Sequence, residues 1–181
     1  MAARLVAYMR KRDLQGRSLL EVGGGIGDLQ VELLKSGVAS AVNVELSTEY
    51  EEAATELSVA EGLADRIDRR LGDFVEQQDL VDSADLVVLN RVICCYPWMD
   101  RMMDASVTKT RWLLAVSVPR DRLISRLMVR AGNWVDGLGG SGFRAYVHPV
   151  AEIEAIASRD GLSKVFSKRG LVWEGLVFER L

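Results

Sequence analysis

Residues 18–27 read Ser18-Leu-Leu-Glu-Val-Gly-Gly-Gly-Ile-Gly27. The apolar start predicts a β-strand over residues 18–22, and the glycines predict a turn into a helix that begins at Asp28 and ends before Gly37. Glycines at such a turn let the backbone approach a ligand closely and leave the N–H groups of the helix free. This stretch therefore predicts a ligand-binding loop between a strand and a helix.

Three interpretations of this loop are open. The dinucleotide fingerprint G-x-G-x-x-G fails, because its last glycine position, counted from Gly23, is occupied by Asp28. The observed pattern is an acidic residue, Glu21, followed by glycines at positions 23, 25 and 27. The charge of Glu21 at the base of the turn favours a ligand with a cationic amino-acid end over a pyrophosphate. The third interpretation is a glycine turn that binds nothing.

Short apolar runs alternate with helical periodicity along the chain, which is typical of an α/β fold with a mostly parallel sheet. After the first strand, further strands are expected at residues 41–44, 67–71, 84–89 and 112–118. Two last strands, near residues 165–167 and 171–178, are close enough to form an antiparallel pair. The expected fold is a Rossmann-like open, mostly parallel sheet with helices on both faces and an antiparallel C-terminal edge strand.

Two of the expected helices have recognisable ends. Thr48 and Glu51 have capping-box spacing, and an apolar face follows at residues 50, 53, 54 and 57. Pro149 suits the first turn of the last helix, and Gly161 marks the end of that helix.

Two acidic residues follow predicted strands at the same edge of the sheet as the glycine loop. Glu45 ends the second strand, where a carboxylate can accept both hydroxyls of a ribose. Asp73 follows Gly72 after the third strand, where it can accept from an adenine amino group. Taken singly, Glu45 is an ordinary acid before a helix and Gly72-Asp73 an ordinary turn. Together with the loop, they predict a nucleoside-containing ligand at the carboxyl ends of the strands.

The glycine loop, Glu45, Gly72-Asp73 and the late strand pair resemble the class I S-adenosylmethionine-dependent methyltransferases, from about Ser18 to Leu181. The resemblance implies that the glycines pack on the methionine part of S-adenosylmethionine, that Glu45 holds the ribose and that Asp73 frames the adenine. The implied cofactor-binding residues are Glu21, Gly23, Gly25, Gly27, Glu45, Leu46, Gly72, Asp73, Phe74, Asn90, Arg91 and Val92.

Residues 92–97, Val-Ile-Cys-Cys-Tyr-Pro, are distantly similar to a stretch of the magnesium-protoporphyrin O-methyltransferases. In that family a histidine precedes the Tyr-Pro pair, whereas this chain has Cys95.

The resemblance predicts methyl transfer, in which alignment and desolvation of the reactants matter most. Because no N-P-P-Y-type motif follows the fourth strand, the expected acceptor is a small molecule with an oxygen, carbon or nitrogen nucleophile. The candidate catalytic residues are Tyr96 and His148. Tyr96, just past that strand, could orient an acceptor or act as a base, and His148 is a candidate general base. Simple packing and a hydrogen bond at a helix start are their alternative roles. Two alternative functions are an S-adenosylmethionine-binding protein without transferase activity and a nicotinamide-dependent oxidoreductase.

Residues 120–148 are predicted to form the acceptor side of the site, as a helix followed by a mobile lid. A basic stripe at i+4 spacing lies in the first part, at residues 122, 126 and 130, and five glycines lie between Gly132 and Gly142. A glycine-rich segment has little intrinsic order, as a closing loop requires. The alternative is a surface insertion with no part in the reaction.

Composition narrows the function classes further. The length of 181 residues and the hydrophobic fraction of 49% predict one domain over residues 1–181, with a short helix within residues 1–17. The net charge of −3 argues against general nucleic-acid binding. No apolar run approaches the ~20 residues that span a bilayer. The two cysteines, Cys94 and Cys95, are adjacent, which excludes a disulfide framework and a cysteine-rich zinc site, and no metal is expected. Free thiols are typical of a reducing compartment, so the cytoplasm is the expected location. The oligomeric state is left open.

Overall fold

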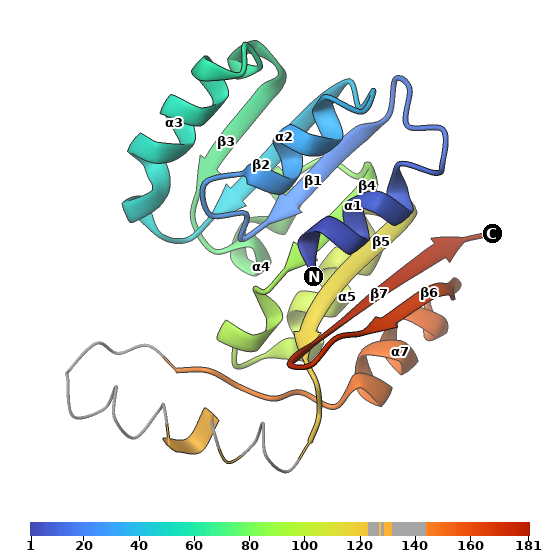
Figure 1. Cartoon of the computed structure of the whole chain (residues 1–181). Helices are drawn as coiled ribbons and strands as arrows, with labels where there is room; N and C mark the ends of the chain where they lie inside the picture. Colours follow the sequence, from blue (N-terminus) through green and yellow to red (C-terminus); the bar gives the residue numbers. More distant parts are fainter. Residues whose placement is uncertain (123–126, 128, 132–143) are drawn as a thin grey trace.

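Seven strands of the described part of the chain form one sheet, in the order β3-β2-β1-β4-β5-β7-β6 (Figure 1). The computed structural model describes residues 1–122, 127, 129–131 and 144–181. The strands are β1 (Ser18–Val22), β2 (Ser40–Glu45), β3 (Ile67–Leu71), β4 (Ala84–Asn90), β5 (Thr110–Pro119), β6 (Leu162–Arg169) and β7 (Trp173–Arg180). Strands β1 to β5 pair in parallel, and β7 is antiparallel to β5 and β6. The expected sheet is confirmed.

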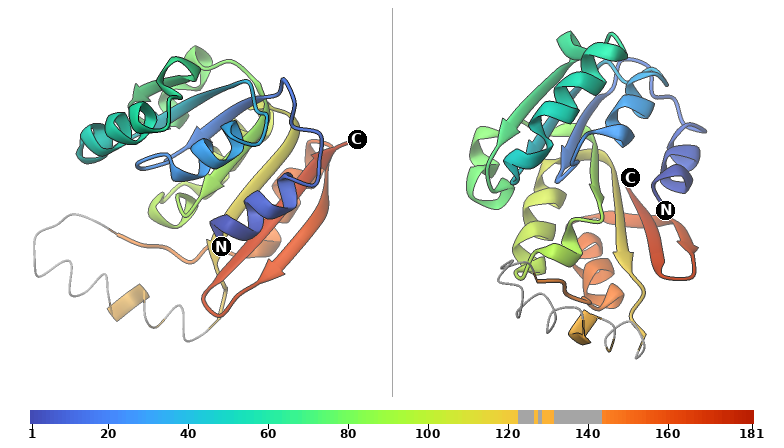
Figure 2. Two further views of the ribbon diagram at one scale, coloured as in Figure 1. Left: turned by 45° about the horizontal axis from the view of Figure 1, so that its top comes forward. Right: turned by 60° about the vertical axis from the view of Figure 1, so that its left-hand side comes forward.

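Helices cover both faces of this sheet (Figure 2). They are α1 (Ala2–Met9), α2 (Asp28–Leu34), α3 (Glu51–Ala60), α4 (Phe74–Gln77), α5 (Met99–Lys109) and α7 (Val150–Arg159), with 3-10 turns η1 (Thr48–Tyr50), η2 (Ala64–Arg66), η3 (Gln78–Leu80) and η4 (Ile93–Cys95). One hydrophobic core lies beneath α4, α5 and α7, and a second lies beneath α1 and α2.

Strand β4 belongs to both cores, because successive side chains of a strand point to opposite faces. Val87 and Leu89 pack in the first core, whereas Leu86 and Val88 pack in the second. All four side chains are fully buried. Burial on both faces therefore explains why the sequence of β4 is a continuous apolar run.

The helix after β2 begins differently from the prediction. Ser47, rather than Thr48, is the capping residue, since its hydroxyl accepts from the backbone N–H of Glu49 at 3.2 Å. The 3-10 turn η1 then precedes α3. The expected apolar face is correct in part: Ala54 is buried and Leu57 packs against the core beneath α1 and α2, whereas Tyr50 is 43% exposed and Ala53 is exposed.

At the other end of the chain, Pro149 takes the capping position immediately before α7, one residue earlier than predicted. Gly161 lies just beyond the helix with a φ of 81°, the left-handed conformation expected of a glycine that ends a helix. The predicted acceptor-side helix and lid in residues 120–148 lie largely outside the described residues. In the described ranges, no helix combines the length and apolar character that crossing a membrane requires.

Candidate functional site

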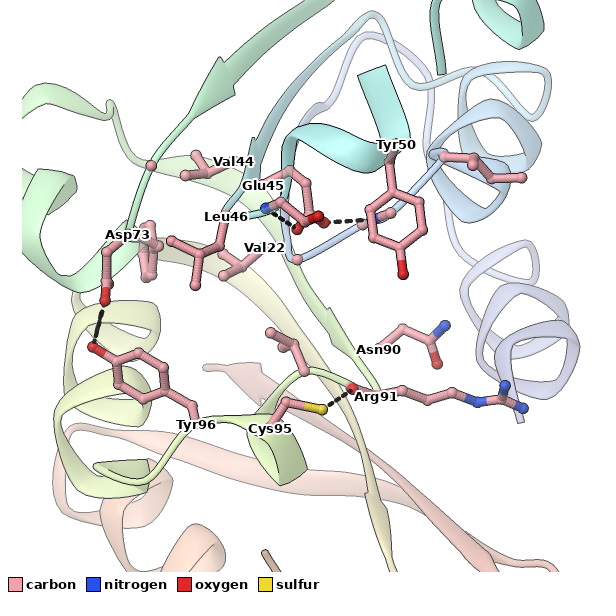
Figure 3. A pocket seen from close by; sticks show the side chains of 18 of the residues that line it. Val22, Val44, Glu45, Leu46, Tyr50, Asp73, Asn90, Arg91, Cys95 and Tyr96 are labelled. Carbon is pink, nitrogen blue, oxygen red and sulfur yellow. Dashed lines mark hydrogen bonds between the residues drawn. The ribbon is translucent and has the colours of Figure 1, made fainter. Parts of the chain in front are cut away.

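A cavity of about 680 Å³ opens at the carboxyl ends of the parallel strands (Figure 3). Because β1 to β4 are parallel, the loops that follow them meet at one edge of the sheet, which is where open α/β sheets bind ligands. The predicted site residues on its wall are Gly23, Gly25, Glu45, Leu46, Gly72, Asp73, Phe74, Asn90, Arg91, Val92 and Tyr96. The topology thus brings residues from four separate loops to one cavity.

The glycine loop between β1 and α2 has a backbone conformation that residues with a side chain rarely adopt. Gly23, Gly25 and Gly27 have φ angles of 62°, 57° and 83°, all in the left-handed region. A Cβ atom on Gly23 would also overlap the side chain of Val92, so the loop packs directly against the segment after β4. Because Gly23 and Gly25 have no side chains, their backbone lies open to the cavity.

Glu45, the last residue of β2, is held by two backbone N–H groups. Its Oε2 accepts from Gly25 at 2.8 Å, and its Oε1 accepts from Ser47 at 2.9 Å. The residue is only 7% exposed but lies on the cavity wall. These bonds fix the carboxylate between the glycine loop and the loop after β2, and each oxygen keeps a lone pair that can accept from a ligand hydroxyl.

Asp73 and Tyr96 face each other on one side of the cavity (Figure 3). Oδ1 of Asp73 accepts from the backbone N–H of Val75 at 2.8 Å and so caps α4, while the Tyr96 hydroxyl donates to Oδ2 at 2.9 Å. Burial, and then the hydrogen bond to Asp73, raise the pKa of Tyr96 to about 12. A phenol that keeps its proton at neutral pH cannot accept another, so this environment argues against the predicted base role of Tyr96.

His148 is not among the residues that line the cavity. Its Nε2 is 3.0 Å from the carbonyl oxygen of Tyr96, and because a carbonyl only accepts, this nitrogen donates. The imidazole stacks on Tyr146, whose backbone N–H donates to the carbonyl of Cys94 at 2.7 Å. The predicted general-base role is therefore not supported by its position. His148 instead attaches the segment before α7 to the loop after β4.

Glu21 and Gly27 lie next to the glycine loop but not on the cavity wall. Glu21 is 1% exposed, and burial, together with repulsion from Asp28, raises the pKa of its carboxyl group to about 8. In the described part of the chain, Glu21 Oε2 and Nη2 of Arg69 are buried without a hydrogen-bond partner. Burial therefore opposes the negative charge expected at the base of the turn, because the raised pKa favours the protonated carboxyl group near neutral pH.

The end of β4 is organised by a buried serine on β5. The Ser117 hydroxyl donates to Oδ1 of Asn90 at 2.7 Å and accepts from the backbone N–H of Arg91 at 3.0 Å. Arg91 has a φ of 62°, which is unusual for a residue with a side chain. Its guanidinium lies 5.0 Å from the ring centre of Trp173. Asn90 and Arg91 thus have fixed positions on the side of the cavity opposite Asp73 (Figure 3).

Several wall residues were missed by the sequence analysis. They are Val22, Gly24, Ile26, Asp28, Val44, Ser47, Glu49, Tyr50, Cys95 and Met102. Tyr50 could have been suggested by its nearness to Glu45 in the sequence, but Met102 comes from α5 and carries no local signal. Cys94 is buried, as expected of a small apolar side chain, whereas Cys95 is exposed on the wall. The hydrogen bond with Cys95, and then burial, raise the pKa of the Cys94 thiol.

No group of three or more His, Cys, Asp or Glu side chains in the described ranges is arranged to hold a metal ion. The polar side chains on the cavity wall include the carboxylates of Asp28, Glu45, Glu49 and Asp73, the amide of Asn90 and the guanidinium of Arg91.

The known proteins that are similar to this chain include several methyltransferases. No family model matches the chain. Over 78 residues it is 31% identical to the ribosomal protein L11 methyltransferase of Enterobacter sp. (strain 638), a match that covers 43% of this chain and about a quarter (26%) of that protein.

Solved methyltransferase structures match almost the whole chain. Magnesium protoporphyrin IX methyltransferase from Synechocystis PCC 6803 with bound SAH (S-adenosylhomocysteine) has a TM-score of 0.78 and 19% identity, covering 99% of this chain and 82% of that one. An O-methyltransferase family protein from Burkholderia thailandensis has a TM-score of 0.77 and 14% identity, covering 99% of this chain and 56% of that one. The chain therefore has the class I S-adenosylmethionine-dependent methyltransferase fold, and the structural side of the resemblance is confirmed.

Proposed function

We propose that this chain binds S-adenosylmethionine in the cavity and transfers its methyl group to a small-molecule acceptor. The observation that carries the proposal is the position of the Glu45 carboxylate, held by two backbone N–H groups between the glycine loop and the loop after β2. With the glycine loop on one side and Asp73 on the other, the wall offers sites for methionine, ribose and adenine in that order. Magnesium protoporphyrin IX methyltransferase, which has the same fold, has been solved with SAM and with SAH bound, which supports this cofactor.

The chain's own residues bind and orient the reactants. When bound, the cofactor supplies a methyl group that its sulfonium makes electrophilic. The glycine loop offers backbone at close range, and Glu45 can accept from two ribose hydroxyls. The segment from Asn90 to Val92 would border the reacting end, where Ser117 fixes the side chain of Asn90 and the backbone of Arg91. Of the two predicted bases, Tyr96 keeps its proton and His148 lies off the wall, so alignment is the main contribution.

Two alternatives are distinguishable. A nicotinamide-dependent oxidoreductase is disfavoured by the broken glycine fingerprint, since Asp28 stands where that pattern needs glycine. A protein that binds the cofactor without transferring methyl would show binding and no turnover with any acceptor.

The free thiols of Cys94 and Cys95 support a reducing compartment, and we propose the cytoplasm as its location.

Calorimetric titration with SAH, S-adenosylmethionine and NADH tests the cofactor. We expect the first two to bind and NADH not to bind. Glu45→Gln removes the charge that accepts from the ribose, so it is expected to weaken SAH binding by ~1–3 kcal/mol, about 5- to 150-fold. The matched control is Glu52→Gln, an exposed residue on α3. Binding of NADH alone would overturn the proposal, and unchanged SAH affinity in a folded Glu45→Gln variant would remove Glu45 from the site.

A further inference from the structure

The contact between Asp73 and Tyr96 joins two loops on the cavity wall. Asp73 follows β3, and Tyr96 follows the η4 turn after β4. The phenol oxygen lies 2.9 Å from Oδ2 and 3.2 Å from Oδ1 of the carboxylate. A phenol has one proton to donate, and this contact uses it. Both groups therefore present only hydrogen-bond acceptors to a ligand.

Tyr96 is held firmly at both ends. Its carbonyl oxygen accepts from Nε2 of His148 at 3.0 Å, and its ring meets the edge of Trp98 at 5.8 Å between centres. The ring also packs against the core beneath α4, α5 and α7. The hydroxyl is therefore fixed in space, and it restricts the carboxylate of Asp73 to one orientation.

We propose that Tyr96 is a positioning residue that acts through Asp73 to select the base of the bound nucleoside. The inference rests on the proposed function, and concerns the adenine end of the cofactor. An exocyclic amino group, as in adenine, donates to the acceptor pair. A purine with an oxygen at that position, as in hypoxanthine, brings a third acceptor against two others, so the hydrogen bond to the carboxylate is lost there and the oxygens repel one another. The pair thus favours a 6-amino purine over a 6-oxo purine.

Binding of SAH and of its deaminated analogue, S-inosylhomocysteine, measured by calorimetry, tests this selection. Wild type is expected to prefer SAH by a large factor. Tyr96→Phe keeps the ring and removes the hydroxyl, and it is expected to reduce this preference by about tenfold, because Asp73 loses its orienting bond. Tyr8→Phe, on α1 and away from the cavity, is the matched control and should leave the preference unchanged.

A second variant separates selection from folding. Asp73→Asn keeps an oxygen that can cap α4, but it introduces an amide N–H₂ group that can donate to a 6-oxo purine. We expect this variant to lose affinity for SAH and to gain affinity for the inosyl analogue. Thermal unfolding of each variant checks that the fold is retained.

The outcomes separate the inference from the proposed function. A folded Tyr96→Phe variant that loses equal affinity for both ligands would overturn the selective role, since a structural defect affects both alike. Equal binding of both ligands by wild type would also overturn it, while leaving the proposed cofactor site intact. Failure of wild type to bind either SAH or S-adenosylmethionine would overturn the proposed function itself.

Discussion

Replacing Glu21 with Gln is expected to make the stability of the protein less dependent on pH. Glu21 lies beneath the glycine loop and is 1% exposed. Burial is the main cause that raises the pKa of its carboxyl group from 4.5 to about 8, and the charges of Asp28 and Glu45 add to this effect, while Arg69 opposes it. Glutamine has nearly the shape of the protonated acid and cannot ionise.

The sign follows from the proton count. Between pH 4.5 and about 8 the native state retains a proton that the unfolded chain has lost, so the free energy of unfolding falls as the pH rises through this window. The slope approaches about 1.4 kcal/mol per pH unit, and the loss between pH 5 and pH 7 is about 2.5 kcal/mol. Because Glu21→Gln removes this loss, its stability relative to wild type should rise by the same amount across that interval.

Urea unfolding followed by circular dichroism at pH 5, 6, 7 and 8 measures the effect. Glu56→Gln, an exposed residue on α3, is the matched control and should unfold in parallel with wild type at every pH. If the difference in unfolding free energy between Glu21→Gln and wild type were the same at pH 5 and pH 7, Glu21 would be ionised in the native state and our account of the buried carboxyl would be incorrect.

Two other predictions concern the cavity wall. Gly23→Ala and Gly25→Ala both place a side chain at a left-handed φ, but only at Gly23 would the new Cβ overlap Val92. Gly23→Ala should therefore lower the melting temperature more than Gly25→Ala. An equal decrease in melting temperature would contradict the close packing of Gly23 against Val92. N-ethylmaleimide should alkylate exposed Cys95 before buried Cys94, and saturating SAH should slow this reaction; labelling that ignores SAH would separate the cofactor from this cavity.

The strands could be predicted because their signals are local. A run of apolar residues such as β4 needs only burial on both faces to be explained, and its flanking residues end it. The start of α3 could not be predicted with the same precision. Ser47 and Thr48 are adjacent and both can cap a helix, so the 3-10 turn decides between them. Tyr50, the last residue of this turn, lies on the cavity wall rather than on a buried helix face.

The core of the site was predictable for a topological reason. Gly23, Glu45 and Asp73 each lie at or just beyond the end of a parallel strand, and parallel strands bring their carboxyl ends to one edge of the sheet. Met102 contributes to the same wall from the side of α5, and its orientation depends on how that helix packs. No pattern near residue 102 contains this information, because the neighbours that fix it are distant in the sequence.

Tyr96 and His148 show what residue type alone leaves undetermined. Both side chains have chemistry suited to proton transfer, and both use it on structural partners: the phenol donates to Asp73, and Nε2 of His148 donates to the backbone of Tyr96. The two contacts are consecutive, so His148 supports Tyr96, and Tyr96 orients Asp73. Residues chosen as catalysts from the sequence thus form a chain of contacts that ends at the proposed adenine position. Under the proposed function, these polar side chains would serve recognition, and the acceptor itself would supply the nucleophile for methyl transfer.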